Sequence, residues 1–419
     1  MKKLDYKWGA LLLLWVAFFL QQGTRQIYGP LVGSIQASTG ATDVQMGLAS
    51  TVFTLVYGLT IPFAGFAADL FSRKWMVVVG VAIFSLGILS SGLVTAIGAL
   101  VVTYGLVNGF GQPFYYPAST SLMSQLHANS KATALSLLQL GMYIGIIGCS
   151  WLAGWFAGLG AEGWRLPFKV LGVAGLVWAV VLAIFLKKSS NHLNRRIVER
   201  WSTESTSQTS QTSLRLFSSA LKAMFSKPAA VLIALALGME VYVDVGFKTW
   251  MPDYLATTFG VTKASAGLNA VLWHYLGAAV GILVGSRLGD RLVVKRPRVR
   301  IELIGGGLLL AVPFILWMSQ ATTFATCCTA MAFFGFFRGV YDSNNFAAFF
   351  DVVEPRYHAS AAGFNLMIAF VIGCFSPTVL GWTKANYSMS VGLATLAAVY
   401  FAGVVILFIA RSERSGEID

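Results

Sequence analysis

The stretch that decides the fold reads Gly65-Phe-Ala-Ala-Asp69-Leu-Phe-Ser-Arg73-Lys74, and it stands at the end of a long apolar run. A degenerate copy, Ser286-Arg-Leu-Gly-Asp290-Arg291, ends another apolar run in the second half of the chain. The two copies occupy corresponding places, which indicates that the chain is a duplicated half. Repeats of mostly apolar sequence are typical of one class of membrane protein, the secondary transporters.

The composition predicts a polytopic membrane protein. Of the 419 residues 56% are apolar and 11% are charged, whereas a soluble domain carries about a quarter charged residues. Apolar runs long enough to cross a bilayer, about 20 residues, lie near 8–28, 46–70, 75–97, 99–125, 132–159, 167–186, 229–255, 264–288, 299–319, 322–350, 359–385 and 389–409. We therefore expect an all-α fold of twelve transmembrane helices in two pseudo-symmetric six-helix bundles, 1–186 and 228–419.

The segment between the bundles, residues 187–227, is polar and basic, with a Ser/Thr/Gln-rich stretch from Ser202 to Ser213. Such a composition cannot bury a core, so we expect a linker that joins the bundles loosely. The four cysteines all fall inside apolar runs and are expected to be packing residues.

The net charge of +13 sets the expected orientation. If both termini are cytoplasmic, most Lys and Arg residues fall on the cytoplasmic side, and only Arg165, Lys169, Lys263 and Lys384 fall on or near the other side. This is the positive-inside asymmetry. The sequence predicts a multi-pass protein of a plasma membrane, the inner membrane in a bacterium, with contacts to anionic lipid and none to nucleic acid.

Charged residues inside the predicted spans are the strongest site candidates, because each is costly if it faces lipid without a partner. Several lie near the membrane midplane, where transporters of this architecture hold their substrate. Residues four apart share one helix face. Glu240, Asp244 and Lys248 therefore share one face, and Arg338 and Asp342 share another. The residues are Glu240, Asp244, Lys248, Arg338, Asp342 and Arg25.

Arg25 has no opposite charge one helical turn away. Its guanidinium suits bidentate binding of a substrate carboxylate or phosphate, and the alternative is a structural pair with Asp244. Arg338 is either a second anion clamp or neutralised by Asp342. Glu240, Asp244 and Asp342 are the candidate proton carriers, since burial favours the neutral form. Lys248 is expected to reach the outer interface rather than touch a ligand.

Uncharged polar residues accompany these charges. Hydroxyl and amide groups suit a polyhydroxylated ligand and aromatic faces suit a sugar ring, although each such residue is also a common bridge between helices. His274 is a candidate proton shuttle or a buried, hydrogen-bonded histidine. The candidate substrate residues are Tyr28, Gln112, Tyr115, Tyr116, Tyr242, His274, Tyr341, Asn344, Asn345 and Asn365.

The Gly65 to Lys74 stretch, together with twelve spans in a 6+6 repeat, resembles the major facilitator superfamily. The resemblance implies that Asp69, Arg73 and Lys74 are gate residues, with Asp290 and Arg291 as the second copy. Leu70 and Ser72 depart from the family pattern, where a basic residue and a glycine are usual.

Within the superfamily the chain is similar to the anion:cation symporters and the organophosphate:phosphate antiporters, through Arg25 and the segment Lys248-Thr-Trp250-Met-Pro252-Asp-Tyr254-Leu255. Asp244 stands where the second group has another arginine. The resemblance therefore disfavours a dianionic phosphate and favours a monocarboxylated sugar with proton coupling. The drug/proton antiporter arginine of the fourth span is absent, since Asn108 occupies that neighbourhood.

These observations predict a proton-coupled symporter for a small organic anion, with a sugar acid such as a hexuronate, aldonate or sialate as the expected substrate and sodium as the alternative coupling ion. The rivals are organophosphate/phosphate antiport, a neutral sugar or lipid carrier, and a membrane sensor that has lost transport. No phosphate-binding loop, nucleophile elbow or metal triad occurs in the sequence, so we expect no enzyme activity, no cofactor and no metal. A monomer is expected.

Overall fold

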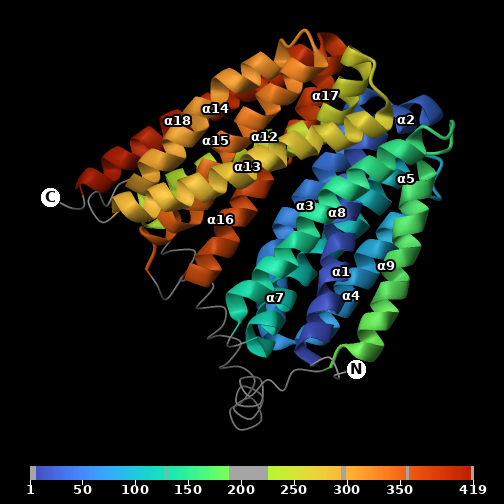
Figure 1. Cartoon of the computed structure of the whole chain (residues 1–419), viewed down its shortest axis with the longest axis horizontal. Coiled ribbons are helices and arrows are strands. Elements are labelled where there is room, and N and C mark those ends of the chain that lie inside the picture. Colours follow the sequence, from blue (N-terminus) through green and yellow to red (C-terminus); the bar gives the residue numbers. More distant parts are fainter. Residues whose placement is uncertain (1–5, 128–129, 188–224, 294–298, 355–357, 417–419) are drawn as a thin grey trace.

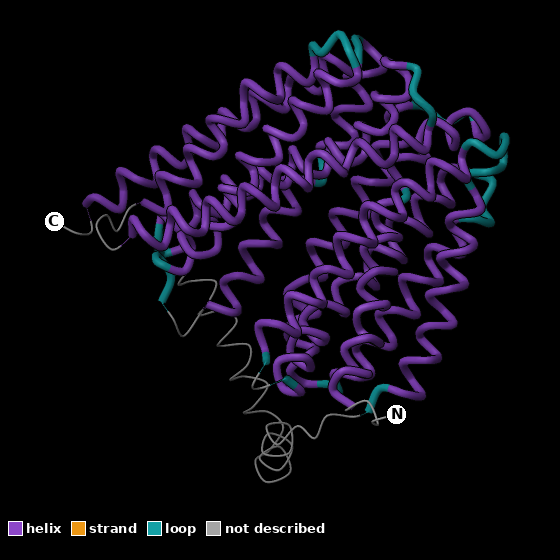
Figure 2. The backbone as a smooth tube through the Cα atoms, in the orientation of Figure 1, coloured by secondary structure: helices purple, strands orange, loops and turns teal. Residues whose placement is uncertain are grey.

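The computed structural model describes residues 6–127, 130–187, 225–293, 299–354 and 358–416, and within these ranges all regular elements are helices (Figure 2). The predicted linker lies almost wholly outside the described residues. Ten segments are long and apolar enough to cross a membrane. They comprise α3 (Asp43–Leu70), α4 (Arg73–Ser91), α8 (Lys131–Ala157), α9 (Arg165–Phe185), α12 (Pro228–Phe259), α13 (Lys263–Val293), α14 (Val299–Ser319), α15 (Phe324–Phe350), α16 (His358–Gly373) with α17 (Ser376–Asn386), and α18 (Met389–Gly416).

Two further spans are assembled from shorter helices. The first span is α1 (Tyr6–Gln26) followed by α2 (Tyr28–Thr39). The fourth span runs through α5 (Ile97–Leu100), η1 (Val101–Asn108), α6 (Gly109–Gly111), η2 (Gln112–Phe114) and α7 (Tyr115–Leu126). The prediction of twelve spans is confirmed.

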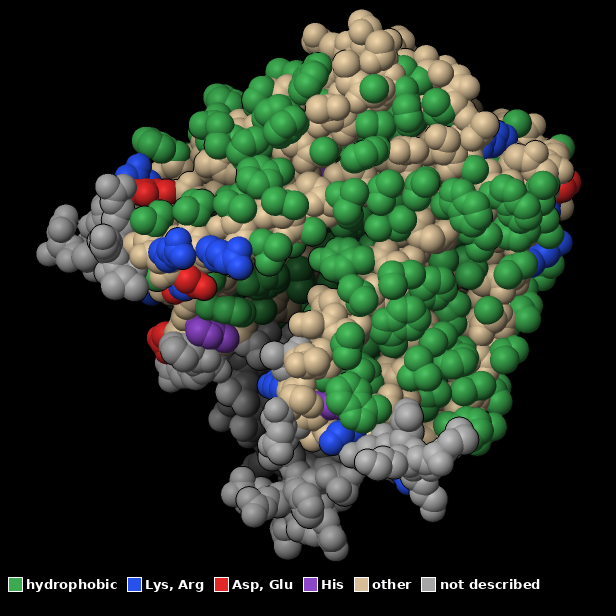
Figure 3. Space-filling view, in the orientation of Figure 1, with side chains coloured by type: hydrophobic (Ala, Val, Ile, Leu, Met, Phe, Trp, Pro, Cys, Tyr) green, Lys and Arg blue, Asp and Glu red, His purple; other side chains and the backbone are tan. Residues whose placement is uncertain are grey.

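The spans form two bundles that diverge from one end of the molecule (Figure 1). One bundle holds α1 to α9 and the other holds α12 to α18. They meet near α2, α5 and α17, which we call the closed end, and they spread apart toward the end that carries both termini, which we call the open end. Figure 3 shows the molecule hollowed between the bundles on the open side. The structure thus shows a central cleft that is accessible from one side.

Side chains at the closed end bridge the two bundles. Lys384 Nζ on α17 lies 2.8 Å from Asp43 Oδ1 on α3. Lys263 Nζ on α13 donates to Ser34 Oγ on α2 over 2.7 Å. Backbone also meets backbone there, because a Cβ at Gly154 of α8 would overlap the carbonyl oxygen of Lys263. The contact therefore depends on polar pairs and on the missing side chain of Gly154.

Two spans are broken where proline removes a backbone hydrogen bond. Pro30 cannot donate to the carbonyl of Gln26, and the first span bends at Ile27 between α1 and α2. Pro377 likewise follows the break between α16 and α17. Both breaks lie in spans that contact the other bundle.

The predicted ends of the first and third spans are wrong. The first span continues past Tyr28 to Thr39, and Gly40, with φ +68°, ends it. The sequence hid this because Gly29, Pro30 and Gly33 read as the start of a loop. The third span ends at Ser91 rather than near Ile97, since a turn occupies the intervening residues.

Candidate functional site

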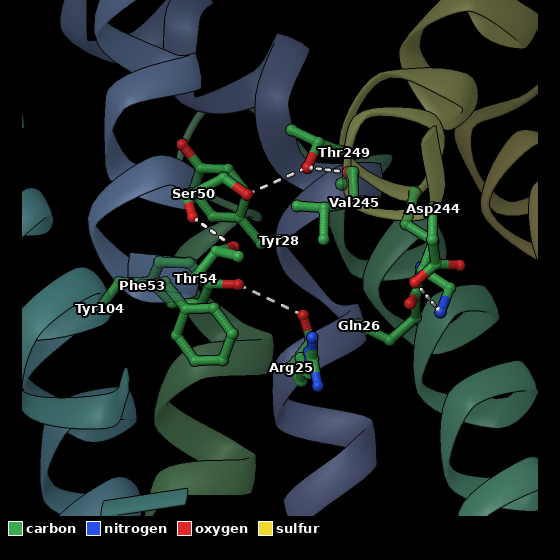
Figure 4. Close-up of a pocket in the computed structure, with 12 residues that line it drawn as sticks. Arg25, Gln26, Tyr28, Ser50, Phe53, Thr54, Tyr104, Asp244, Val245 and Thr249 are labelled. Carbon is green, nitrogen blue, oxygen red and sulfur yellow. Dashed lines mark hydrogen bonds and ion pairs between the residues drawn. The ribbon is translucent and has the colours of Figure 1, made fainter. Parts of the chain in front are cut away.

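A pocket lies where the two bundles meet, and both bundles line it (Figure 4). Its empty volume is about 380 Å³, which includes space open to solvent. The residues from α1, α2, α3 and η1 are Arg25, Gln26, Tyr28, Gly29, Ser50, Phe53, Thr54 and Tyr104, and those from α12 are Asp244, Val245, Lys248 and Thr249. The span break before Pro30 places Arg25 in this pocket, near the middle of the first span.

The guanidinium of Arg25 is surrounded by aromatic rings. Its Cζ lies 4.8 Å from the ring centre of Tyr57, 5.5 Å from Phe53 and 5.6 Å from Phe370. These are cation–π distances. Tyr57 and Phe53 belong to α3, whereas Phe370 belongs to α16 in the other bundle and touches Tyr57 edge-on at 4.9 Å. Both bundles therefore hold this cation.

Arg25 forms no ion pair with any acidic side chain in the part of the chain that the structure describes. The alternative of a structural pair with Asp244 is not what the structure shows, since Asp244 contacts Lys248 and Arg338 instead. In Figure 4, Arg25 stands between Phe53 and Tyr104 on one side and Asp244 on the other. Its charge is left available to an anion in the pocket.

The hydroxyl groups of the residues that line the pocket already have partners. Tyr28 Oη donates to the carbonyl of Met46 over 2.7 Å. Tyr104 Oη donates to the backbone carbonyl of Arg25 over 3.2 Å, and its ring stacks on that of Tyr28 at 4.5 Å. Ser50 Oγ and Thr249 Oγ1 lie 3.0 Å apart across the two bundles. The wall beside Arg25 is mainly aromatic, with few hydroxyls to spare.

Tyr104 owes its position to an irregular fourth span. It lies in the π-helical turn η1, and such turns are frequent at functional sites. The span can pack tightly there because Gly109 and Gly111 have no side chains. A Cβ at Gly109 would lie 2.9 Å from the carbonyl oxygen of Phe53, and one at Gly111 would lie 2.5 Å from the backbone nitrogen of Phe84.

A charged cluster centred on Arg338 adjoins the pocket. The Arg338 guanidinium contacts Asp244 through Nη1 and lies 2.8 Å through Nε from Glu240 Oε1, although the angle is not that of a hydrogen bond. Asp342 is further away, at 3.5 Å. Lys248 Nζ binds the other oxygen of Asp244 at 2.9 Å. All except Asp342 are largely buried.

His274 of α13 completes this cluster. Arg338 Nη1 lies 2.7 Å from Nε2 of His274, and a guanidinium can only donate. Nε2 is therefore the acceptor and the proton is on Nδ1, which makes His274 neutral in this arrangement. With His274 neutral, the cluster pairs two cations with the three carboxyl groups of Glu240, Asp244 and Asp342.

Several predicted substrate residues lie away from the pocket and connect helices. Gln112 donates to Asn108 Oδ1 and to the carbonyl of Gln21, and Tyr115 Oη donates to the carbonyl of Leu14. Asn344 donates to the carbonyl of Gly285. These contacts are those of helix-bridging residues. None of the three lines the pocket around Arg25, and their role in substrate binding stays a prediction.

The remaining predicted residues are spread through the structure. Tyr341 Oη donates to Asn345 Oδ1 over 3.1 Å within α15. Tyr116 is exposed and Tyr242 is half-buried. Asn365 of α16 is fully buried, and neither side-chain atom has a hydrogen-bond partner among the described residues. Of the predicted substrate residues, only Arg25 and Tyr28 line the pocket.

The predicted gate residues all lie at the open end. Asp69 is in the last turn of α3, and its side chain lies outside what the structure describes. Arg73 begins α4, and the ammonium of Lys74 lies 5.5 Å from the Trp75 ring centre. Asp290 lies 3.9 Å from Arg300, which also binds Asp351 at 3.0 Å. Arg300 rather than the exposed Arg291 is thus the partner of Asp290.

Sequence reasoning missed two groups of residues. The triad of Asp43, Lys384 and Asp253 lies at the closed end, with Lys384 Nζ 2.8 Å from each carboxylate. The aromatic residues around Arg25 carry no sequence signal, because phenylalanine is common in membrane helices. Lys248, a site candidate from its position one turn after Asp244, was expected to reach the outer interface but lines the pocket instead.

Comparisons with known proteins agree with this architecture. A family model described as Major Facilitator Superfamily matches residues 14–377 and 244–418. The chain is 25% identical over 412 residues to the cis,cis-muconate transport protein of Acinetobacter baylyi, covering 96% of this chain and 94% of that protein. It is 25% identical to protein spinster homolog 1 of Xenopus tropicalis, covering 84% of this chain and 68% of that protein.

Solved structures show the same fold. A bacterial homolog of the human lysosomal transporter Spinster, in an inward-facing and unoccupied conformation, superposes with a TM-score of 0.77 at 19% identity and covers 98% of this chain and 96% of its own. A D-xylose-proton symporter superposes with a TM-score of 0.72 at 14% identity, covering 96% and 97%.

Proposed function

Since the chain belongs to the major facilitator superfamily of transporters, we propose that it carries a small, flat organic anion whose carboxylate binds Arg25. The observation that supports this most is the guanidinium of Arg25 at the junction of the two bundles. It has no acidic partner among the described residues and is ringed by Phe53, Tyr57 and Phe370. A half-buried arginine without an acidic partner can bind a carboxylate. The muconate transport protein among the relatives supports an organic anion as cargo.

The character of the wall favours an unsaturated or aromatic carboxylate over a sugar acid. Sugar hydroxyls need both donors and acceptors, but the hydroxyls of Tyr28, Tyr104 and Thr249 already donate to backbone carbonyls. They can therefore offer a sugar only an acceptor. Aromatic faces pack well on a flat conjugated ligand. The sugar acids expected from the sequence remain the second candidate, and they are separated by the experiment below.

We also propose that transport is coupled to protons, by symport. Arg338 and Lys248 neutralise two of the three nearby carboxyl groups. The third carboxyl group costs the least free energy to bury when it is protonated and therefore neutral. Asp342 has the most exposed side chain of the three, at 36%. It also lies farthest from the guanidinium of Arg338. Glu240, Asp244 and Asp342 are the candidate carriers of this proton.

The proposed orientation places the open end in the cytoplasm. The positive-inside asymmetry of the sequence and the position of both termini at the open end support it. In that orientation the structure is an inward-facing state of a plasma-membrane carrier, and loss of the Asp43–Lys384 contact would open it to the outside.

Uptake into proteoliposomes of purified protein tests the proposal. We expect a pH gradient, acid outside, to drive uptake of radiolabelled cis,cis-muconate or benzoate above that of glucuronate. Arg25→Gln is expected to reduce this uptake at least about 30-fold. Truncating one partner of a buried charge pair costs about 2 kcal/mol or more of binding free energy. Lys169→Gln, on α9 outside the pocket, is the control. Preferential uptake of glucuronate, or full activity of Arg25→Gln, would contradict the proposal.

A further inference from the structure

A second cation lines the same pocket from the opposite bundle. Lys248 lies on α12, whereas Arg25 lies on α1. Both cations line this one pocket, so their like charges face the same space. Two like charges from two bundles around one pocket are stabilised by a ligand that carries two negative charges.

In the structure Lys248 is held by a neighbour on its own helix. Its ammonium lies 2.9 Å from Asp244 Oδ2, one turn away, and 5.3 Å from the ring centre of Tyr275. The Lys248 side chain is 23% exposed, so it is accessible from the pocket. A ligand carboxylate can therefore compete with Asp244 for the same ammonium.

Asp244 can release Lys248 without becoming an isolated buried charge. Its other oxygen contacts the guanidinium of Arg338. Losing one partner of a buried ion pair is costly when nothing replaces it, but here Asp244 keeps Arg338 and Lys248 gains the ligand. After the exchange each residue has one ion pair: Asp244 keeps Arg338, and Lys248 has the ligand in place of Asp244.

From this arrangement we infer that Lys248 is the specificity-determining residue for a dicarboxylate. While the pocket is empty, the Asp244 carboxylate binds the Lys248 ammonium in place of the second ligand carboxylate. One carboxylate of the ligand binds Arg25 and the other replaces Asp244 on Lys248. Such a ligand joins α1 to α12, whereas a monocarboxylate binds only one bundle. The inference rests on the proposed function, since it assumes that Arg25 binds the first carboxylate.

The test compares a dicarboxylate with its own monoester. Binding of cis,cis-muconate and of its monomethyl ester to purified protein is measured by calorimetry for the wild type and for Lys248→Gln, Lys248→Arg and Arg25→Gln. Lys248→Gln is expected to weaken muconate binding about 30-fold and monoester binding less than about 3-fold, because only the former loses a charge-assisted contact. Lys248→Arg is expected to restore most of the affinity for muconate.

Asp244→Asn is expected to change the affinity for muconate in the opposite direction. Without the competing carboxylate, muconate binding is expected to tighten several-fold, while monoester binding stays unchanged. This variant keeps the inference testable if Lys248→Gln fails to fold. Equal weakening of both ligands by Lys248→Gln, or no tightening by Asp244→Asn, would overturn the inference.

The pattern also separates the two proposals. If Arg25→Gln leaves both affinities unchanged, or if the wild type binds neither ligand, the proposed function fails and the role of Lys248 fails with it. If Arg25→Gln weakens both ligands and Lys248→Gln does not discriminate between them, only the role of Lys248 fails.

Discussion

Breaking the ion pair between Asp43 and Lys384 is expected to shift the molecule away from the state in the structure. Lys384 Nζ lies 2.8 Å from Asp43 across the two bundles and 2.8 Å from Asp253 within its own bundle. Asp43→Asn removes the charge that crosses the bundles and preserves the shape of the side chain. Asp253→Asn removes the contact within one bundle and is the matched control.

The magnitude follows from the burial of the pair. The side chains of Lys384 and Asp43 are 22% and 20% exposed, so the pair is neither a surface pair nor a fully buried one. A hydrogen bond to a charged group in such a place stabilises by about 2 kcal/mol. Because 1.4 kcal/mol is a tenfold change, Asp43→Asn should shift the conformational equilibrium about 30-fold. An alternative state of about 1% would rise to about a quarter of the population.

Spin labels across the open end measure this shift. Lys131 at the start of α8 and Arg287 near the end of α13 are both exposed, and the four native cysteines are buried, so cysteines at these two positions should label selectively. Electron–electron distance measurements should show a shorter distance gaining population in Asp43→Asn, while Asp253→Asn changes it less than about 3-fold. No change in Asp43→Asn, or equal changes in both variants, would refute the assignment of this pair as a closed-end contact.

Three further outcomes are expected. Gly154→Val should shift the same label pair toward the shorter distance, because its side chain overlaps a backbone carbonyl of the other bundle, whereas Gly148→Val, which has open space, should not. Arg338→Gln should lower the free energy of unfolding by about 3 to 5 kcal/mol, since it leaves buried carboxylates unpaired; an unchanged melting temperature contradicts this. Hydrogen bonds from Arg165 and Ser38 lower the pKa of Glu162, so its stabilisation is present above its ordinary pKa and is lost as pH falls. The melting temperatures of wild type and Glu162→Gln should therefore differ at neutral pH and converge below about pH 4.

The fold could be predicted from the sequence because membrane spans are recorded directly in hydropathy. Each span needs a continuous apolar run, and repeated ends such as Asp69 and Asp290 mark the duplication. Span ends were harder to predict where glycine and proline occur inside a helix. Gly29 and Pro30 resemble a loop in sequence, but the helix continues beyond them to Thr39.

The charged part of the site could also be predicted, because a charged residue inside a membrane span faces the interior of the bundle or an opposite charge. Arg25 and Asp244 were found in this way. The partners of each charge could not be found, since spacing reveals only neighbours on the same helix. Arg338 illustrates the limit: its neighbour Asp342 is its most distant carboxylate contact, and Glu240 and Asp244 on another helix are closer.

Of the uncharged polar residues predicted to bind substrate, only Tyr28 lines the pocket around Arg25. Gln112, Tyr115 and Asn344 share residue types with ligand-binding groups, but each bonds a backbone carbonyl of another helix. A helix-bridging side chain and a ligand-binding one are chemically identical, and only the presence of a pocket separates them. The aromatic rings around Arg25 were missed for the converse reason, because apolar residues are ordinary in every span.

The position of a bound carboxylate tests the central claim most directly. A structure of the protein with a bromine-substituted muconate would locate the ligand by the anomalous scattering of bromine. We predict bromine density in the pocket between α1 and α12, with a ligand carboxylate within hydrogen-bonding distance of the Arg25 guanidinium. Bromine density elsewhere in the bundles, with Arg25 still enclosed by its aromatic neighbours and free of ligand, would contradict the account.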